Sequence, residues 1–276
     1  MNLRPEQIHQ IRETVWGYYH EHAREMPWRR HPSPFNVWLS EMMLQQTQVS
    51  RVIPKFEAFL YTCDSFAELA ELPLSKVLEL WSGLGYNRRA KFLHAAAQMI
   101  VSDYGGQLPN SVDELVKLPG VGRNTAGAIA AYVYNQPVVF VETNIRTVLF
   151  HHVFDGQKDV SDRDILQAAE QLLDVEHPRE WYWALMDYGS FLKSTAGGRN
   201  DASKHYKKQS PLAGSLREMR GRILKTLVSG SMDEQSLRTA VAADERFEVA
   251  LADLVREGFV ERHFETYCLT GYTEPS

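Results

Sequence analysis

A short turn with two glycines limits the folds open to this chain. Residues 118–126 read LPGVGRNTA, with helical patterns before and after them. Glycine adopts left-handed backbone angles at little cost, so two glycines behind Pro119 permit a tight hairpin between helices. The second helix would begin directly after the turn, and its free N–H groups could then bind one phosphate. A plain connection between two packed helices, without a ligand, is the alternative interpretation.

The rest of the first 210 residues also has a helical pattern. Apolar residues recur at helical spacing from residue 5 onward, and no segment alternates with the period of two that marks a strand. Pro54 is expected to end one helix, and Ser65, Ser75 and Ser111 to cap three others. A long helix over residues 87–103 should stop at the glycine pair that follows it. This region is therefore predicted to be all-α.

From Leu212 the pattern changes to three short helices and the hairpin-like run FVERHFETYCLT. Three helices and a hairpin resemble a winged helix, so residues 211–276 are predicted to form a small α+β domain. The third helix carries two arginines against five acidic residues, and phosphates would repel it. We therefore favour packing or protein contact over DNA reading for this domain.

The composition allows two compact units and excludes several classes of protein. A net charge of -5 over 276 residues argues against indiscriminate coating of DNA, so any DNA contact needs a local patch. The basic stretch 193–208, with Lys204 and Lys207, is either such a patch or a solvated linker. Cys63 and Cys268 are too few for a disulfide framework or a metal site. The polar start and the absence of a long apolar run predict a cytoplasmic, nucleoid-associated protein.

One carboxyl group stands in an apolar setting. In WLSEMMLQQTQV, residues 38–49, Glu41 lies among apolar residues at helical spacing, just ahead of two glutamines. A desolvated carboxyl has a raised pKa and can keep its proton near neutral pH. Glu41 is therefore a candidate general acid, and a surface glutamate on an amphipathic helix is the alternative.

Three blocks carry a resemblance to a known family. PWRRHPSPFNVWLSEMMLQQTQV (27–49), WSGLGYNRRAKFLHAAA (81–97) and LPGVGRNTAGAI (118–129) resemble, in the same order, the MutY-type adenine DNA glycosylases of the endonuclease III or HhH-GPD superfamily. The resemblance covers residues 5–192. It implies a two-lobed helix-hairpin-helix core over residues 1–210, with a six-helix barrel at about 36–147 and a second lobe formed by 1–35 and 148–210.

The resemblance also implies a division of labour between carboxyl groups. Glu41 would protonate the leaving base, and Glu142 would stabilise the cationic sugar where the family has aspartate. Asn144 joins them as a catalytic candidate, and Thr143 or Asn144 would cap the helix that follows. Glu142 as an ordinary acidic residue at a helix start is the alternative. Asn124 stands where relatives that also cut the backbone have lysine, so no lyase activity is expected.

The same resemblance predicts the residues that contact DNA. Gln46 and Tyr86 would fill or open the stack around a flipped base, and Leu84 would face the unpaired base, although Gln46 and Tyr86 could also be core or surface residues. The full predicted set is Gln45, Gln46, Leu84, Tyr86, Arg88, Gly120, Gly122, Arg123, Asn124, Thr125, Lys204 and Lys207. The backbone carbonyls of Val116, Leu118 and Val121 would bind a sodium or potassium ion.

Two family features are missing from the sequence. No cysteine follows MDYG (186–189), where the family has iron-sulfur ligands, so neither a cluster nor any other cofactor is expected. The tail is also too short for the Nudix-type domain that recognises 8-oxoguanine. We expect a monomer that binds double-stranded DNA with a mismatch or lesion, and a protein partner could use the C-terminal domain.

These observations favour a monofunctional DNA glycosylase of base excision repair. The first candidate substrate is adenine opposite 8-oxoguanine or guanine, because a purine leaves more readily when its ring nitrogen is protonated. A glycosylase for thymine or uracil mismatches, or for another modified base, is the enzymatic alternative. A lesion-binding protein without catalysis is the alternative from another class.

Overall fold

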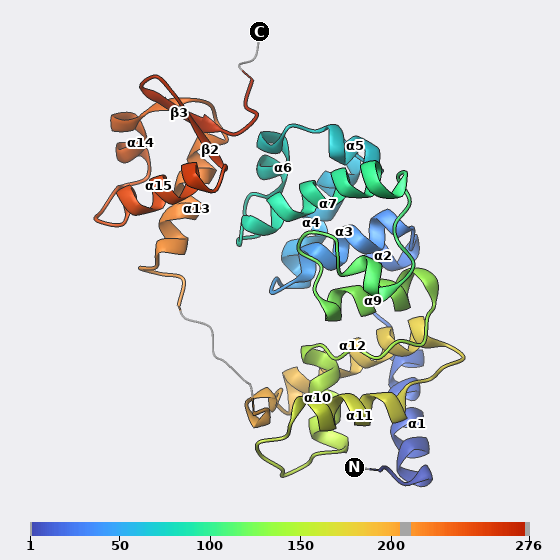
Figure 1. The fold of residues 1–276 in the computed structure, drawn as a ribbon. Helices are drawn as coiled ribbons and strands as arrows, with labels where there is room; N and C mark the ends of the chain where they lie inside the picture. Colours follow the sequence, from blue (N-terminus) through green and yellow to red (C-terminus); the bar gives the residue numbers. More distant parts are fainter. Residues whose placement is uncertain (1, 205–210, 274–276) are drawn as a thin grey trace. The chain divides into compact units, whose positions relative to one another are not determined.

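Helices are the main regular structure of the first 200 residues. The computed structural model describes residues 2–204 and 211–273. Its helices before residue 204 are α1 (Pro5–His22), α2 (Pro27–Arg30), α3 (Pro34–Leu44), α4 (Val49–Thr62), α5 (Phe66–Glu71), α6 (Leu74–Trp81), α7 (Arg88–Tyr104), α8 (Val112–Leu115), α9 (Arg123–Tyr134), α10 (Thr143–His152), α11 (Asp162–Leu172), α12 (Pro178–Thr195) and the 3-10 helix η1 (Asn200–Ala202) (Figure 1). The predicted all-α class of this region is confirmed.

Contacts divide the chain into two compact units. The first unit contains residues 1–41, 109–117 and 121–208, and the second contains residues 42–108, 118–120 and 209–276. These contacts place the C-terminal segment, residues 211–273, in one unit with helices α4 to α7. The domain boundaries expected from the sequence, at about 36, 147 and 210, stay a prediction about which parts fold independently.

The core of the first unit forms where α10 and α12 pack together. Trp181, Tyr182, Phe140 and Phe150 are each at most 1% exposed. A Cβ at Gly189 of α12 would lie 2.2 Å from a backbone oxygen of α10, so only glycine permits this approach of the two helices. The site described below depends on this close packing.

The second unit has its own aromatic core. Phe56, Phe59 and Trp81 are fully buried, and the rings of Phe59 and Trp81 meet edge to face with centroids 6.4 Å apart. Gly120 has φ +76°, and a Cβ there would lie 2.8 Å from Phe92. Glycine at the hairpin is therefore required both by the backbone angle and by space.

The C-terminal segment is a small α+β structure, as predicted. It contains α13 (Leu216–Leu227), β1 (Met232–Asp233), α14 (Glu234–Ala240), α15 (Phe247–Arg256), β2 (Val260–His263) and β3 (Thr266–Leu269). The strands form an antiparallel sheet in the order β1-β3-β2, with Glu261 opposite Cys268. The sequence predicted the β2-β3 hairpin but missed β1, whose two residues are too few to show a period.

Three predicted helix boundaries were wrong. Pro54 is the sixth residue of α4, and the carbonyl that it leaves without an N–H donor belongs to the exposed Ser50. The break after α3 occurs instead near Gln46, which has a left-handed φ of +56°. Ser75 does not cap α6, since its hydroxyl donates to the Gly271 carbonyl. The N-cap of α10 is Glu142, not Thr143 or Asn144.

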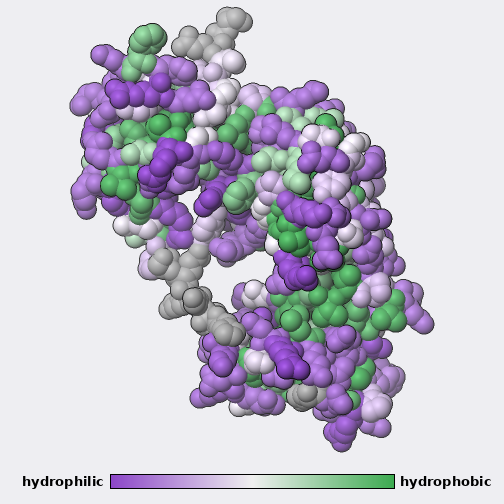
Figure 2. Space-filling model, viewed as in Figure 1, coloured by the Kyte–Doolittle hydropathy of each residue, from purple (hydrophilic) through white to green (hydrophobic). Residues whose placement is uncertain are grey.

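The visible surface in Figure 2 is mostly hydrophilic, with smaller groups of apolar residues between the polar ones. Tyr61 and Phe264 are the most exposed large apolar side chains of the described residues, at 95% and 96%. Within the described chain, none of the helices combines the length and the apolar character needed to span a membrane.

Candidate active site

Glu41 lies on α3, in an otherwise apolar part of the helix. Trp38, Leu39 and Met42 beside it are 0% exposed. Glu41 keeps some surface open to solvent, but protein atoms enclose its carboxyl group closely. Burial raises the pKa of Glu41 well above its usual range, the Glu142 carboxylate raises it further, and Arg29 lowers it. Glu41 therefore has the environment of a carboxyl group that keeps its proton.

Glu142 lies at the start of α10, also in the first unit. It is the N-cap residue, and its side chain makes no hydrogen bond to the helix it precedes. Burial raises the pKa of Glu142 as well. The positive end of the α10 dipole favours the ionised form at this position. The charge of Glu142 is one of the causes that raise the pKa of Glu41, and both residues belong to the first unit.

The segment before Glu142 is held from two sides. The Asn124 amide donates to the Val141 carbonyl at 3.1 Å, and the Tyr182 hydroxyl donates to the Val138 carbonyl at 2.7 Å. A Cβ at Gly127 of α9 would lie 2.9 Å from Phe140, so α9 packs directly on this segment. These contacts fix the backbone that carries the Glu142 carboxylate.

Asn144 fixes the first turn of α10 against α12. Its amide donates to the Met186 carbonyl at 3.3 Å, and its own backbone oxygen is the atom that excludes a side chain at Gly189. Asn144 is therefore tied to α12, and this contact sets the direction in which α10 begins. A direct catalytic role of its amide stays a prediction.

An arginine pair around a buried aspartate was missed by the sequence analysis. Asp187 of α12 is 1% exposed and binds Arg29 through two bonds, of 2.8 and 3.0 Å. Arg24 donates to the same carboxylate from its backbone N–H at 2.9 Å and from Nε at 2.7 Å. Arg29 also lies 5.4 Å from the ring of Trp183. Asp187 thus binds Arg29, which is the one cation among the causes of the pKa shift of Glu41.

Tyr132 of α9 was missed too. Its ring meets Phe140 edge to face and stacks on Trp183, with centroids 6.1 Å apart in both pairs. Burial raises the pKa of Tyr132 well above its usual range, and the charges of Glu41 and Glu142 add to this. The phenol is therefore a neutral group close to both carboxyl groups. In the sequence, Tyr132 is only one aromatic residue in an apolar helix, so nothing there indicates a place beside the carboxyl groups.

In the second unit, a buried arginine organises the end of α3. Arg89 is 8% exposed and donates to the carbonyls of Met42 and Met43 at 3.2 and 3.0 Å. It also donates to the Thr47 hydroxyl at 2.8 Å and to the Gly85 carbonyl at 3.2 Å. Burial lowers the pKa of Arg89 to about 10. The sequence analysis named its neighbour Arg88, which is exposed and lies 5.4 Å from the Phe92 ring.

The predicted wedge residues occupy strained turns. Gln46 is exposed at φ +56°, and Tyr86 is half-buried at φ +50°, an unusual backbone angle for an aromatic residue. Gln45 donates to the Gly120 carbonyl at 3.0 Å. Leu84 is 3% exposed and lies in the core, which does not fit a side chain that faces DNA unless the loop rearranges.

The predicted DNA-contacting residues of the hairpin lie at the start of α9. Gly122 is the N-cap of α9, and no side chain caps the helix start, as a phosphate site requires. Arg123 and Asn124 are exposed there, whereas Thr125 is buried. Arg123 lies 3.6 Å from Asp113 in an exposed ion pair. Of the residues whose carbonyls would bind a monovalent ion, Val116 is exposed, while Leu118 and Val121 are buried.

Only part of the predicted basic patch is described. Lys204 is exposed, and its backbone N–H donates to the Val160 carbonyl at 3.2 Å. Lys207 lies outside the described residues. The patch stays a prediction.

One group of side chains in the described chain has the donor set of a divalent metal. Donor atoms of Glu261, His263 and Cys268 on the β2-β3 hairpin lie within 4.8 Å of one another. Sulfur, imidazole and carboxylate together suit zinc. Glu261 and His263 already pair with each other at 3.2 Å, and His263 is exposed.

The paired carboxyl groups have a defined chemical capacity. Two buried carboxyl groups that interact cannot both ionise easily, so one keeps its proton while the other carries the charge. A protonated acid next to a carboxylate can protonate a leaving group and stabilise the cation that remains. The site is thus suited to breaking a glycosidic bond.

Comparisons with known proteins agree with this reading. The family described as HhH-GPD superfamily base excision DNA repair protein matches residues 39–174. An adenine DNA glycosylase of Buchnera aphidicola subsp. Baizongia pistaciae is 34% identical over 182 residues, which is 65% of this chain and 52% of the relative. That of Mycolicibacterium smegmatis is 40% identical over 155 residues, 54% of this chain and 53% of the relative. The human one is 34% identical over 192 residues, 65% of this chain and 35% of the relative.

Solved structures show the same fold. A thermostable thymine-DNA glycosylase has a TM-score of 0.63 at 22% identity, covering 69% of this chain and 89% of that one. A trapped endonuclease III-DNA covalent intermediate has a TM-score of 0.55 at 21% identity, covering 78% and 93%. The chain spans about half or less of the length of the curated relatives named above. Residues 39–174 of the chain thus match the HhH-GPD superfamily of base excision DNA repair proteins.

Proposed function

We propose that this protein is a monofunctional DNA glycosylase that removes adenine opposite 8-oxoguanine or guanine. The observation that carries the proposal is the pair of Glu41 and Glu142 in the first unit, two half-buried residues whose carboxyl groups both have a raised pKa. A purine is a poor leaving group until a ring nitrogen is protonated, and a carboxyl group that keeps its proton can supply that proton. The similarity to adenine DNA glycosylases supports the choice of base.

In the proposed reaction, Glu41 donates its proton to a ring nitrogen of the flipped adenine. The bond between the base and C1′ of the sugar then breaks, and its electron pair leaves with the base. The Glu142 carboxylate stabilises the positive charge that develops on the sugar. Water adds to C1′, its proton returns to the Glu41 carboxylate, and an abasic site remains.

The bonds of Asp187 to Arg29 suit this mechanism. A free guanidinium next to Glu41 would favour its ionised form and so weaken the acid. The buried Asp187 carboxylate accepts two hydrogen bonds from Arg29 and partly neutralises its charge, and the contact with the Trp183 ring holds the orientation of the guanidinium. Glu41 can then stay protonated although a cation lies near it.

We further propose that the backbone is not cut. The position of a Schiff-base lysine is Asn124, whose amide is not nucleophilic and is bound to the Val141 carbonyl. Borohydride should trap no protein on DNA. A trapped adduct would mean that another amine, such as that of Lys91 or Lys193, attacks the sugar.

The proposed enzyme uses no iron-sulfur cluster. Its segment 190–210 contains no cysteine, so the thiolates that hold the family's cluster are not present there. A sodium or potassium ion at the carbonyls of Val116, Leu118 and Val121 would help the hairpin hold a phosphate. Purified protein should be colourless, and its DNA affinity should fall when a large organic cation replaces both ions.

A panel of duplexes tests the function. Each duplex carries one mismatch or lesion, including adenine opposite 8-oxoguanine, adenine opposite guanine, and thymine or uracil opposite guanine. Release of adenine from the first two supports the proposal, whereas release of thymine or uracil alone would replace its substrate. Tight binding to mismatches with every glycosidic bond intact would indicate a lesion-binding protein without catalysis.

A further inference from the structure

The C-terminal segment contacts the predicted wedge residue of the same unit. Arg217 of α13 donates from Nη1 to the Tyr86 hydroxyl at 2.8 Å, and its guanidinium carbon lies 5.0 Å from the Tyr86 ring centroid. A hydrogen bond from a charged donor is among the stronger ones in proteins. A residue 131 positions away in the sequence therefore holds the tip of this tyrosine.

Tyr86 is also fixed from its own loop. Arg89, which four hydrogen bonds hold in place, has its guanidinium carbon 5.6 Å from the Tyr86 ring centroid. The left-handed backbone of Tyr86 follows Gly85 at φ +77°. The loop thus fixes the position of the Tyr86 ring, and Arg217 fixes the direction in which its hydroxyl group points.

Two further contacts attach the C-terminal segment to α6 and α7. The Lys91 amine donates to the carbonyl of Glu257, and to that of Gly258 at 3.4 Å, where α15 ends. A cation is favoured at a helix C-terminus, and the Lys91 amine also lies 5.4 Å from the Phe259 ring. At the start of α6, Ser75 donates to the Gly271 carbonyl at 2.9 Å. Arg217 therefore reaches Tyr86 from a segment that Lys91 and Ser75 also attach.

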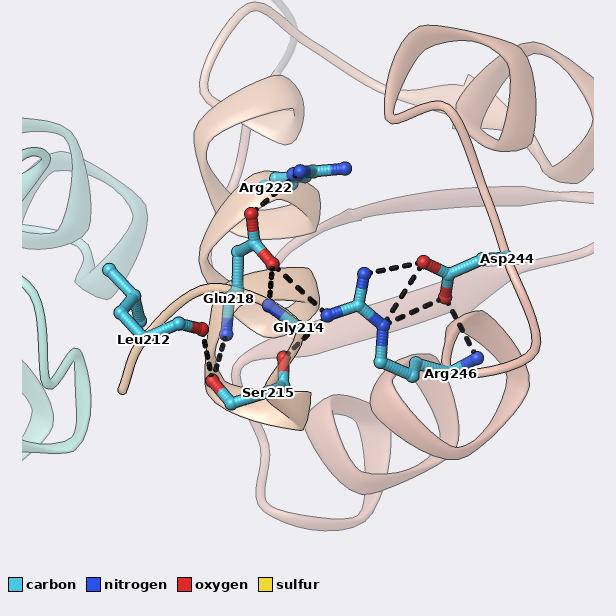
Figure 3. Close-up of polar contacts among 7 residues, drawn as sticks. All are labelled: Leu212, Gly214, Ser215, Glu218, Arg222, Asp244 and Arg246. Carbon is cyan, nitrogen blue, oxygen red and sulfur yellow. Dashed lines mark hydrogen bonds and ion pairs between the residues drawn. The ribbon is translucent and has the colours of Figure 1, made fainter. Parts of the chain in front are cut away.

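The other arginines near the start of α13 bind acids of their own segment. Arg246 pairs with Glu218 at 3.0 Å and also with Asp244, and Arg222 pairs with Glu218 at 2.7 Å (Figure 3). Arg220 pairs with Glu257 at 2.8 Å. These contacts join α13 to the start and the end of α15. They hold α13, the helix that carries Arg217, in place against α15.

We propose that Arg217 is a positioning residue for base extrusion, which holds Tyr86 in the orientation that enters the DNA stack. The inference rests on the proposed function, because it needs a base to be flipped. It gives the C-terminal segment a role in substrate engagement that acts through a phenol rather than through phosphates. Loss of the bond should leave the ring in place but free its hydroxyl end.

A double-mutant cycle tests this coupling. The probe is a duplex with 2-aminopurine in place of the target adenine opposite 8-oxoguanine, whose fluorescence rises when the base leaves the stack. Arg217→Ala and Tyr86→Phe should each lower the extrusion equilibrium by about tenfold, the size expected for one hydrogen bond with a charged partner. Because both substitutions remove the same bond, the double variant should extrude the base no less than the more impaired of the two single variants. Arg217→Lys should recover part of the loss.

Lys225→Ala is the matched control, since it removes one positive charge from the exposed face of the same helix and should change extrusion by less than about twofold. Additive losses in the cycle, together with a weaker salt dependence of binding, would overturn the proposal in favour of a direct phosphate contact. An unchanged Arg217→Ala variant, or a wild type that extrudes nothing, would overturn it as well. Extrusion by a wild type that excises no base would instead reject the proposed glycosylase activity.

Discussion

The carboxyl groups of the first unit and those of the C-terminal segment have opposite surroundings. Burial is the largest cause that raises the pKa of Glu41 and of Glu142. Hydrogen bonds from Arg246 lower the pKa of Asp244 to about 2, and the backbone of Gly214 together with Arg246 and Arg222 lowers that of Glu218. The first pair is proposed to hold a proton for chemistry, whereas the second pair binds arginines that join helices of the C-terminal segment.

The largest effect should come from the acid. Glu41→Gln keeps the shape of the side chain but cannot donate the proton, so single-turnover excision should fall by about 10²- to 10⁴-fold. DNA affinity should stay within a few fold of wild type. Glu57→Gln, on the exposed face of α4, is the matched control. A near wild-type rate for Glu41→Gln would remove Glu41 from the acid role.

Glu142 should give the next largest effect. Its side chain is one methylene longer than the aspartate of the resembled family, and the held segment 138–142 is expected to be shaped around that length. Glu142→Asp should therefore slow excision, by up to about 10²-fold if the carboxylate is displaced by an ångström. Glu142→Gln should slow it further, since it removes the charge. Faster excision by Glu142→Asp would mean that glutamate is a poor substitute, and equal rates for all three would leave Glu142 as an ordinary helix-start acid.

The coupling of the two carboxyl groups should appear in the pH profile. Excision needs protonated Glu41, so its rate should fall about tenfold per pH unit above the raised pKa of that group. Glu142→Gln removes one cause of the raised pKa, so this fall should begin at lower pH. Single-turnover rates across the pH range provide the measurement. A profile that does not shift would show that the two groups titrate independently.

Stability should depend on pH in opposite directions in the two regions. When the pKa of a carboxyl group is higher in the folded than in the unfolded state, the folded state binds more protons at pH values between the two. The contribution of that group to stability therefore falls as pH rises through this range. Glu41→Gln should then raise the melting temperature more at about pH 8 than at about pH 5. Equal shifts at both would contradict a raised pKa for Glu41.

Asp244 should behave in the reverse way. Its folded pKa of about 2 is below the unfolded value, so its contribution is complete above the unfolded pKa of about 3.9 and is lost as pH falls through about 2. Asp244→Asn should lower the melting temperature by at most about 2–4 °C at neutral pH, since the ion pair is near the surface. The difference should shrink below about pH 4. Asp113→Asn, in an exposed pair, should change little at either pH.

Local signals allowed much of the fold and the two central carboxyl groups to be predicted. The helix pattern, the glycine stop at Gly105 and the caps at Ser65 and Ser111 depend on neighbours in sequence, and these were confirmed. Glu41 was proposed from its apolar helix, whereas Glu142 was proposed from the resemblance to the MutY-type family. The placement of both in one unit agrees with that prediction, while their roles stay predictions.

Contacts distant in sequence could not be predicted. Arg29 and Asp187 are separated by 158 residues, and nothing in either local sequence indicates the pairing. Tyr132 looks like any aromatic core residue until Trp183 and the carboxyl groups are placed around it. Ser75 has the local form of a cap, but its hydroxyl bonds to the distant Gly271.

Gly189 shows how a residue without a side chain can limit the evolution of this protein. Its hydrogen faces the backbone oxygen of Asn144, only two residues after Glu142, so any larger residue would push apart the helices that set the carboxylate. A screen of random variants for lost repair would therefore score Gly189 as if it were part of the reaction. Efforts to alter substrate choice should leave it unchanged and vary residues whose replacement does not move α10.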